Sequence, residues 1–338
     1  MIGVSVIVCC YNSASRLPET IKHLALQNVD PTIAWEIIIV NNNSSDNTTE
    51  VAKKEWNKYN LSVPFSIIDE ARAGLSFARE AGIVTSKYNY LVFCDDDNWL
   101  FEDYVNQVFK IMSSNSSIGM LGGVGYPVTD SENLELLHKF SGDFATGPQG
   151  IIGTSLDDIT ESKGYVYGAG AVLRKEALLE LKKKKINYLL TDRIGNNLAS
   201  GGDVELAFYI RMLKFRIFYS DSLRFHHFLP KNRITWSYIK RLHYSFGLSS
   251  SLYIIPDIYF KNPRKQAYKY STKWLFMNAS RNLLKKIIIS VIKGDFSKDY
   301  QKCLIEIINQ AGYCRGLLIN YKKNRMKYVE MREKFPIT

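Results

Sequence analysis

Short apolar runs alternate with amphipathic segments over the first part of the chain. The runs are rich in β-branched residues, as buried strands are, and they cover residues 4–9, 35–40, 65–69 and 90–94. The segments between them place apolar side chains at helical spacing, as Leu17, Ile21 and Leu24 do. Strands that alternate with helices predict an α/β fold with a mostly parallel, twisted sheet wound in the right-handed sense.

The later chain continues this pattern less regularly. A helix is expected at 101–112, a glycine-rich strand at 119–125, and a strand that enters a helix at 165–175, whereas residues 130–165 show little period. From residue 237 onward, helical spacing predominates and Lys and Tyr are frequent. We therefore expect a mainly helical C-terminal region after the sheet.

Three polar turns follow predicted strands. Tyr11 and Asn12 follow the first strand, residues 41–43 follow the second, and residues 95–97 follow the fourth. Because ligands of parallel sheets bind outside the carboxyl ends of the strands, these turns are expected to meet at one site. No G-x-G-x-x-G motif follows the first strand, and the segment 122–125 lacks the third glycine, so a mononucleotide fits this edge better than a dinucleotide.

Asp95, Asp96 and Asp97 place three carboxylates directly after the fourth run. Like charges raise one another's pKa, so such a cluster is usually held ionised by a divalent cation or by donors from a ligand. An extended backbone would point Asp95 and Asp97 to one face and Asp96 to the other. The cluster is therefore either a site for a hard cation or an acidic turn that caps a helix, and Asp96 is expected to tolerate substitution best.

Charge is distributed unevenly along the 338 residues. The net charge is +11, and residues 261–338 carry 18 Lys and Arg against 5 Asp and Glu, which makes +13 and leaves −2 for residues 1–260. A basic region of this kind indicates a polyanionic partner, either nucleic acid or an anionic membrane face. The five cysteines form no C-x-x-C pair, no signal-type basic segment opens the sequence, and no apolar run approaches about 18 residues. These features predict a cytoplasmic protein, with docking on the inner face of the plasma membrane as a further expectation.

Four segments, in this order, resemble a family 2 glycosyltransferase of the GT-A fold. They are VSVIVCCYN at 4–12, IVNNNSSDNT at 39–48, GLSFAR at 74–79 and FCDDD at 93–97. The resemblance covers about residues 1–245. It implies a nucleotide-binding half at about 1–125, an acceptor half at about 126–245 and a basic helical region at 246–338.

The activity that this resemblance implies is an inverting, metal-dependent sugar transfer. The donor would be a nucleotide diphosphate sugar, UDP-linked, and the acceptor a hydroxyl of a glycan or lipid-linked glycan in cell-surface polysaccharide synthesis. The D-x-D element of the family, which binds the donor diphosphate through Mn²⁺ or Mg²⁺, corresponds to Asp95 and Asp97, and a His near the metal in some relatives corresponds to His227. The general base corresponds to Asp203, in the segment GGDVEL at 201–206.

The resemblance further implies contacts to the nucleotide, the donor sugar or the acceptor. The residues at these positions are Tyr11, Asn12, Asn41, Asn42, Arg72, Arg79, Asp95, Asp96, Gly168, Gly170 and Glu205. The chain departs from the family pattern where aspartates are frequent, at Asn41, Asn42 and Asn98, and where Gly202 replaces a Glu before the base. The three asparagines concern the contacts to uracil more than the class of enzyme. Gly202 removes one carboxylate but leaves Asp203 as the candidate base.

Structural interpretations stay open for several of these residues. Arg72 and Arg79 also fit solvated helix arginines, and His227 also fits an imidazole packed in an apolar run. Asp203, taken alone, fits a helix N-cap. The apolar segment 281–293, with its basic flanks, fits either a helix lying on a membrane surface or a helix of a C-terminal bundle.

Two other functions are alternatives. A nucleotidyltransferase acting on sugar phosphates also combines an α/β nucleotide fold with acidic metal ligands, but it normally carries a glycine-rich loop with Lys or Arg after the first strand, which residues 10–14 lack. A nucleic-acid-binding protein using the basic region would be expected to show an RNA motif or zinc spacing there, and neither is found. Processive synthases carry a Q-x-x-R-W element, whereas Arg233 to Trp236 has no Gln at the required position, which favours single addition.

Overall fold

A computed structural model describes residues 1–186, 188, 201–261, 272–292 and 300–336. The chain forms two compact units. The first comprises residues 1–183 and 209–234, and the second comprises residues 184–208 and 235–338.

Four parallel strands form the first half of the sheet in the first unit, in the spatial order β3-β2-β1-β4. They are β1 (Val4–Cys10), β2 (Trp35–Asn41), β3 (Phe65–Asp69) and β4 (Tyr90–Asp95). The central strands β1, β2 and β4 are almost continuously apolar because both faces of the sheet are covered. In the register of the sheet, Cys10 pairs with Asn41 and Cys9 pairs with Asp95, so the first, second and fourth strands end at the same edge.

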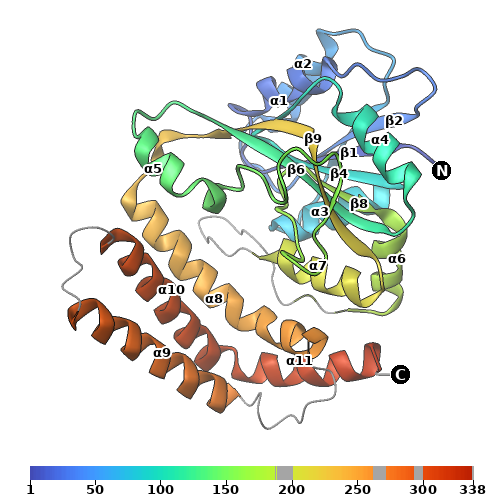
Figure 1. The fold of residues 1–338 in the computed structure, drawn as a ribbon. Coiled ribbons are helices and arrows are strands. Elements are labelled where there is room, and N and C mark those ends of the chain that lie inside the picture. The colour runs from blue at the N-terminus through green and yellow to red at the C-terminus, as the bar shows by residue number, and fades with distance from the viewer. Residues whose placement is uncertain (187, 189–200, 262–271, 293–299, 337–338) are drawn as a thin grey trace. The chain divides into compact units, whose positions relative to one another are not determined.

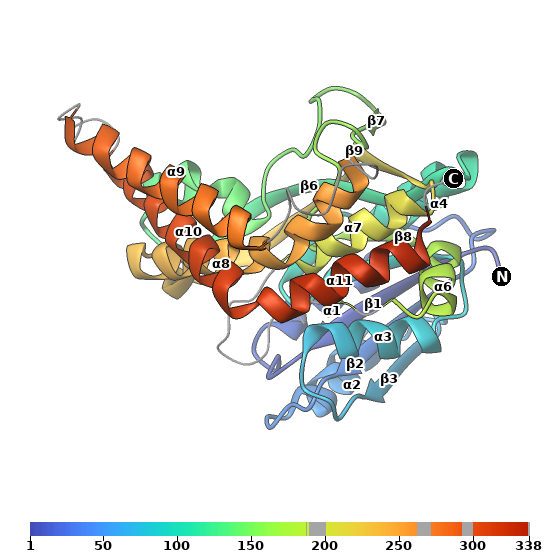
Figure 2. The ribbon, with the colours of Figure 1, turned by 90° about the horizontal axis from the view of Figure 1, so that it is seen from below.

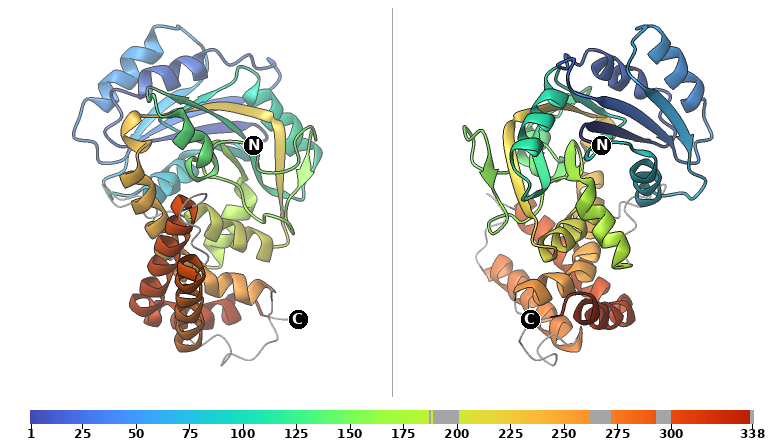
Figure 3. Two further views of the ribbon diagram at one scale, coloured as in Figure 1. Left: turned by 60° about the vertical axis from the view of Figure 1, so that its left-hand side comes forward. Right: turned by 90° about the vertical axis from the view of Figure 1, so that its right-hand side faces the viewer.

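Helices cover both faces of these strands (Figure 1). Those that follow the strands are α1 (Leu17–Ala25), α2 (Thr48–Asn57), α3 (Leu75–Thr85) and α4 (Tyr104–Ser114). Apolar side chains of α1, α2 and α4 share one buried core with Val4, Val6 and Val8. On the other face, Gly82 of α3 lies so close to Ile7 that an added Cβ would be 2.4 Å from its Cγ2. Figure 3 shows the blue strands between the blue helices α1 and α2 and the cyan helix α3.

The second half of the sheet is mixed. The strands are β5 (Asn98–Leu100), β6 (Ile118–Thr129), β7 (Asp157–Asp158), β8 (Ala171–Arg174) and β9 (Arg216–Leu229). β8 is antiparallel to both β4 and β6, β9 runs parallel to β6, and β5 and β7 are antiparallel to β9. Two short helices, α5 (Leu134–Lys139) and α6 (Lys175–Lys183), complete this unit. The predicted α/β fold with a helix-flanked central sheet is confirmed, and its parallel part is β3-β2-β1-β4.

The second unit is helical. It contains α8 (Trp236–Lys261), α9 (Thr272–Ile292), α10 (Tyr300–Ile319) and α11 (Tyr321–Lys334), and α7 (Gly202–Met212) begins in it. Figure 2 shows α8, α10 and α9 side by side. Backbones of α8 and α10 approach closely at glycines, because a Cβ on Gly247 would lie 2.0 Å from the Asn309 carbonyl oxygen. The predicted helical C-terminal extension is therefore present, and α8 runs through the expected boundary at residue 245.

None of the helices in the described ranges combines the length and the apolar character that a membrane span requires. The segment 281–293 lies almost entirely in α9, and only Lys293 falls outside the described residues.

Candidate active site

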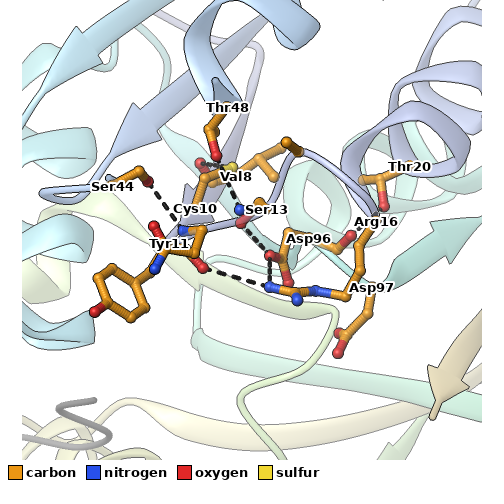
Figure 4. Close-up of polar contacts among 12 residues, drawn as sticks. Val8, Cys10, Tyr11, Ser13, Arg16, Thr20, Ser44, Thr48, Asp96 and Asp97 are labelled. Carbon is orange, nitrogen blue, oxygen red and sulfur yellow. Dashed lines mark hydrogen bonds and ion pairs between the residues drawn. The ribbon is translucent and has the colours of Figure 1, made fainter. Parts of the chain in front are cut away.

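The three polar turns meet at the carboxyl ends of β1, β2 and β4, as predicted. Asn12, whose φ of 49° is left-handed, accepts a hydrogen bond from the Ser45 backbone N–H at 2.8 Å through its side-chain oxygen, and its own N–H donates to Ser44 Oγ at 3.0 Å. The Ser13 N–H donates to Thr48 Oγ1 at 2.8 Å. The first and second turns are thereby fixed to each other, while the Tyr11 side chain points away from this cluster (Figure 4).

Asp96 joins the first turn to the fourth. Its Oδ2 accepts a hydrogen bond from Ser13 Oγ and forms an ion pair with Arg16 Nη2 at 2.5 Å, and Thr20 Oγ1 donates to its backbone oxygen at 2.8 Å. The backbone turns at residues 96–97 instead of staying extended. The Asp96 and Asp97 carboxylates nevertheless point to different sides, as an extended backbone would also have placed them (Figure 4). Asp96 was expected to tolerate substitution best, but its buried carboxylate binds Ser13 of the first turn and Arg16, the residue before α1, so substitution there is now expected to be costly.

The pKa of Asp96 is raised to about 6, first by burial and then by the charge of the neighbouring Asp97. The charge and hydrogen bond of Arg16 oppose this shift without outweighing it. Carboxylates at this edge therefore need positive charge nearby in order to stay ionised.

Asp97 has a cationic neighbour, Arg233, and an imidazole neighbour, His227, which carries a positive charge only when it is protonated. Its side chain is buried, with 4% exposed, and Arg233 Nη1 lies 3.2 Å from its Oδ2. His227 Nε2 lies 3.5 Å from its Oδ1. His227 comes from β9, and Arg233 comes from the short 3₁₀ helix that follows it, η2 (Lys231–Arg233). The structure thus brings the predicted pair Asp97 and His227 together and adds Arg233, which the sequence analysis considered only as part of an incomplete Q-x-x-R-W element.

The donor set at this edge fits a hard divalent cation. Carboxylate oxygens are the preferred ligands of Mg²⁺ and Mn²⁺, and Asp97 already lies in a position that attracts positive charge. Within the described ranges, no group of three His, Cys, Asp or Glu side chains is arranged to hold a metal ion by itself. A cation at Asp95 and Asp97 would therefore need further oxygen ligands, such as those of a diphosphate.

The two asparagines of the second turn differ in their surroundings. Asn42 is buried; its Nδ2 donates to the backbone oxygens of Glu70 and Arg72 at 3.0 and 2.7 Å, and its Oδ1 accepts from the Gly74 N–H at 2.8 Å. Asn41 is half-buried and donates to Asp69 Oδ1 at 2.8 Å. These bonds give Asn42 a structural role in joining two turns, and contact with a base stays a prediction for Asn41.

Arg79 and Arg72 also differ in their surroundings. The Arg79 guanidinium lies 4.9 Å from the ring centre of Phe93 in β4 and directly against Gly168, where an added Cβ would be 2.8 Å from Nη2. Arg72 is exposed and pairs with Glu70 through Nε at 2.9 Å and Nη2 at 2.7 Å, which lowers the pKa of Glu70 to about 2. Arg79 thus lies beside another predicted site residue, whereas Arg72 has a surface partner.

At Gly168 and Gly170, the two glycines predicted to lie close to a ligand, protein side chains lie close to the backbone. Arg79 lies against Gly168, as described above. Gly170 has a left-handed φ of 64°, and an added Cβ would lie 2.8 Å from the ring of Phe225. The Tyr104 hydroxyl donates to the Gly170 carbonyl oxygen. Backbone conformation and packing therefore account for Gly170.

Asp203 and Glu205 lie in the first turn of α7. Asp203 is half-buried, and its Oδ1 accepts a hydrogen bond from the Val204 N–H at 2.9 Å. Glu205 is fully buried, and its Oε1 lies 4.0 Å from Lys327 Nζ of α11. Burial against a lysine favours a structural role for Glu205 over contact with an acceptor.

The cations that pair with these carboxylates were not predicted from the sequence. Arg16, Arg233 and Lys327 each pair with a carboxylate at a separation of 80, 136 and 122 residues along the chain. Local pattern carries no information about such distant pairs. The acidic cluster at residues 95–97 was the one sequence feature that indicated such cations, because clustered carboxylates need positively charged neighbours in order to stay ionised.

The model of the family described as "Glycosyl transferase family 2" matches residues 5–181 of this chain, which is more than half of its length. This match covers the four parallel strands and the three turns that meet at their ends.

Curated relatives include glycosyltransferases of Streptococcus pneumoniae and Staphylococcus aureus. The glycosyltransferase GlyA of Streptococcus pneumoniae is 30% identical over 136 residues, covering 40% of this chain and 18% of GlyA. The poly(ribitol-phosphate) β-N-acetylglucosaminyltransferase TarS of Staphylococcus aureus is 24% identical over 268 residues, covering 73% of this chain and 45% of TarS. The chain spans between 18% and 32% of the length of the first curated relatives.

Solved structures share the fold. A crystal structure of S. aureus TarS residues 1–349 in complex with UDP-GlcNAc has a TM-score of 0.53 at 13% identity, covering 95% of this chain and 92% of that chain. The mannosyltransferase PcManGT from Pyrobaculum calidifontis in complex with GDP-Man and Mn²⁺ has a TM-score of 0.58 at 15% identity, covering 94% and 86%. At these identities the likeness establishes a common GT-A fold.

Proposed function

The chain belongs to glycosyltransferase family 2, and from this premise we propose that it transfers one sugar from a UDP-linked donor to a hydroxyl of a glycan or lipid-linked glycan of the cell surface. The observation that carries the proposal is Asp97, a buried carboxylate beside Arg233 and His227 at the edge where three turns meet. A diphosphate needs positive charge of this kind around it.

Asp95 and Asp97 would hold Mn²⁺ or Mg²⁺, with His227 as a further candidate ligand. When bound, the ion would neutralise negative charge that develops on the departing diphosphate. Arg233 would add a second positive group there, and Arg79, beside Gly168, would add a third on the donor side. These groups lower the barrier because they are already oriented before the bond breaks.

Asp203 would act as the general base. Its carboxylate would take the proton of the acceptor hydroxyl while the hydroxyl oxygen forms a bond to C1 of the donor sugar. The bond between C1 and the diphosphate oxygen would break on the opposite face, and the electron pair would leave with the diphosphate. A single displacement of this kind inverts the anomeric centre and needs no carboxylate nucleophile.

Relatives support the class of substrate. The names of TarS and its TarP counterpart describe transfer of N-acetylglucosamine to poly(ribitol-phosphate), and the related structures contain UDP-GlcNAc, UDP or GDP-Man. From the names and contents of these relatives, UDP-linked sugars are the first donors to test here.

A thermal-shift screen of UDP-, GDP- and dTDP-sugars, with Mn²⁺ or with EDTA, tests the donor class. A UDP-sugar with Mn²⁺ is expected to raise the melting temperature, because a ligand at 100 times its Kd adds about 2.7 kcal/mol to the unfolding free energy. The same sugar with EDTA is expected to give a smaller rise. If no nucleotide sugar shifts the transition, the proposed donor class is wrong.

We also propose that α9 docks on an anionic membrane face. Exposed apolar residues recur along α9 at spacings of three, seven and four, at Trp274, Met277, Leu284 and Ile288. Lys273, Arg281 and Lys285 are exposed as well, and the helix contains no acidic residue. Two copies of such a helix would repel each other, whereas anionic lipids attract it.

Flotation with vesicles of phosphatidylglycerol and phosphatidylcholine tests this surface. Changing Lys273, Arg281 and Lys285 together to Glu is expected to weaken binding by at least about a hundredfold, because each basic residue contributes about 1 kcal/mol near the surface. The matched control changes three exposed basic residues of α11 to Glu, at Lys322, Lys323 and Arg325. Equal recovery of the α9 variant and the wild-type protein would rule out α9 as the docking surface.

A further inference from the structure

Lys327 is an unusual residue for its position in the basic C-terminal region. Residues 321–334 are strongly basic in sequence, but they form the continuous helix α11, and Lys327 is 1% exposed. Its Nζ donates to Glu330 Oε2 at 2.8 Å, one turn further along α11. A lysine is rarely buried to this extent unless its charge is paired.

The second partner of Lys327 is Glu205 of α7, 4.0 Å from Nζ to Oε1. Glu205 is fully buried, and its backbone N–H donates to the Gly201 carbonyl oxygen at 2.9 Å, which closes the first turn of the helix. Asp203 lies in this same turn, two residues earlier. The ion pair therefore connects α11 directly to the turn that carries the proposed base.

Other buried polar contacts anchor α11 at this place. Asn324 Nδ2 donates to the Ser251 carbonyl oxygen of α8 at 2.9 Å, and Asn320 Nδ2 donates to Ser251 Oγ at 3.0 Å. At the far end, Lys184 Nζ donates to the Lys334 carbonyl oxygen at 3.1 Å. These bonds fix the position of α11 along its axis and its rotation about that axis. The Lys327 side chain is therefore directed toward Glu205.

We infer that Lys327 is a positioning residue, which holds the first turn of α7 through Glu205 and so fixes the proposed base Asp203. The inference rests on the proposed function for the role of Asp203. Burying an ammonium group between two carboxylates is unfavourable unless the geometry is well matched, and apolar side chains would pack there at lower cost. The charged pair is therefore suited to orienting α7, because an ion pair specifies the rotation of this helix more narrowly than an apolar contact does.

Glu205→Gln is the central variant, because it removes the charge of the pair, keeps the shape of the side chain and leaves Lys327 paired with Glu330. We expect kcat for transfer to fall by about 10- to 100-fold, since small displacements of a reacting group have effects of this size. The Kd of the donor without acceptor is expected to stay within about twofold of the wild-type value, because no donor contact is proposed for this turn. Lys323→Met, at an exposed position of α11, is the control and should change neither value.

Hydrogen–deuterium exchange gives a readout that does not depend on activity. Amides of residues 201–206 are expected to exchange at least about tenfold faster in Glu205→Gln and in Lys327→Met than in the wild-type protein. The double variant Glu205→Gln, Lys327→Met is expected to recover the melting temperature lost in Lys327→Met, because only the partly exposed Glu330 then lacks its lysine. The kcat of the double variant is expected to stay low.

Unchanged exchange and unchanged kcat in Glu205→Gln would overturn the inference, and so would recovery of kcat together with melting temperature in the double variant. Failure of the proposed function gives a different result. In that case the wild-type protein transfers no sugar from any donor, and the exchange measurement alone still decides whether Lys327 holds the first turn of α7.

Discussion

Asp203→Asn is expected to abolish sugar transfer while it leaves donor binding nearly unchanged. An amide keeps the shape of the side chain and its position in the first turn of α7, but it cannot take the proton of the acceptor hydroxyl. General base catalysis contributes about 10²- to 10⁴-fold to a rate, so a loss of at least that size is expected in single-turnover transfer. Calorimetric titration with the donor alone should give a Kd within about twofold of the wild-type value.

The control for this variant is Glu135→Gln, a carboxylate-to-amide change at an exposed position of α5. It should transfer at the wild-type rate. Transfer by Asp203→Asn at that same rate would show that another group takes the proton, and the half-buried Asp203 would then be only a residue of the helix N-terminus.

Asp97→Ala is expected to remove the part of donor affinity that depends on the metal. The substitution takes away a buried carboxylate but leaves Arg233, which can still bind a phosphate. With Mn²⁺, the Kd of the UDP-sugar should rise by about 100-fold or more, because a bound cation contributes several kcal/mol to charge stabilisation. With EDTA, the Kd of the variant should be close to that of the wild-type protein.

Calorimetry of Asp97→Ala and Asp97→Asn, each with Mn²⁺ and with EDTA, makes this comparison. Asp97→Asn keeps one oxygen ligand and should show a smaller loss than Asp97→Ala. An identical dependence on Mn²⁺ in the wild-type protein and in Asp97→Ala would remove Asp97 from the metal site.

The sequence predicts the parallel half of the sheet well, for a physical reason. Strands β1, β2 and β4 are buried on both faces, so each is a short apolar run that stands out between amphipathic helices. Strand β9 was harder to predict from the sequence. In this strand of 14 residues, buried Phe225 and Leu229 alternate with half-exposed His226 and Phe228, so a continuous apolar run is missing there. Its pairing with β6, β5 and β7 depends on contacts between distant segments.

The site was predictable in its parts but not in its bonding. Parallel strands bring their carboxyl ends to one edge, and this predicted that Asn12, the second turn and the acidic cluster would meet. Residue types alone could not show that Asp96 would accept hydrogen bonds from Ser13 and Arg16. They also could not show that Asn42 would hydrogen-bond to backbone groups of the neighbouring turn. In both cases the partner is set by a turn conformation that the sequence pattern does not specify.

The basic residues of the C-terminal region also differ in their roles. The excess of Lys and Arg after residue 260 predicts a polyanionic partner, and the exposed basic residues of α9 fit that prediction. Lys327 belongs to the same excess but is buried in an ion pair within the protein. Net charge therefore describes the surface of this region only after such internal pairs have been set aside.

The proposed mechanism is a metal-assisted transfer with separate residues for donor binding and proton removal. The most direct test measures UDP-sugar binding and sugar transfer in Mn²⁺ for the wild-type protein, Asp97→Ala and Asp203→Asn, side by side. We predict that Asp203→Asn binds the donor like the wild-type protein and does not transfer, and that Asp97→Ala loses both metal-dependent binding and transfer. Transfer by both variants at the wild-type rate would contradict this account.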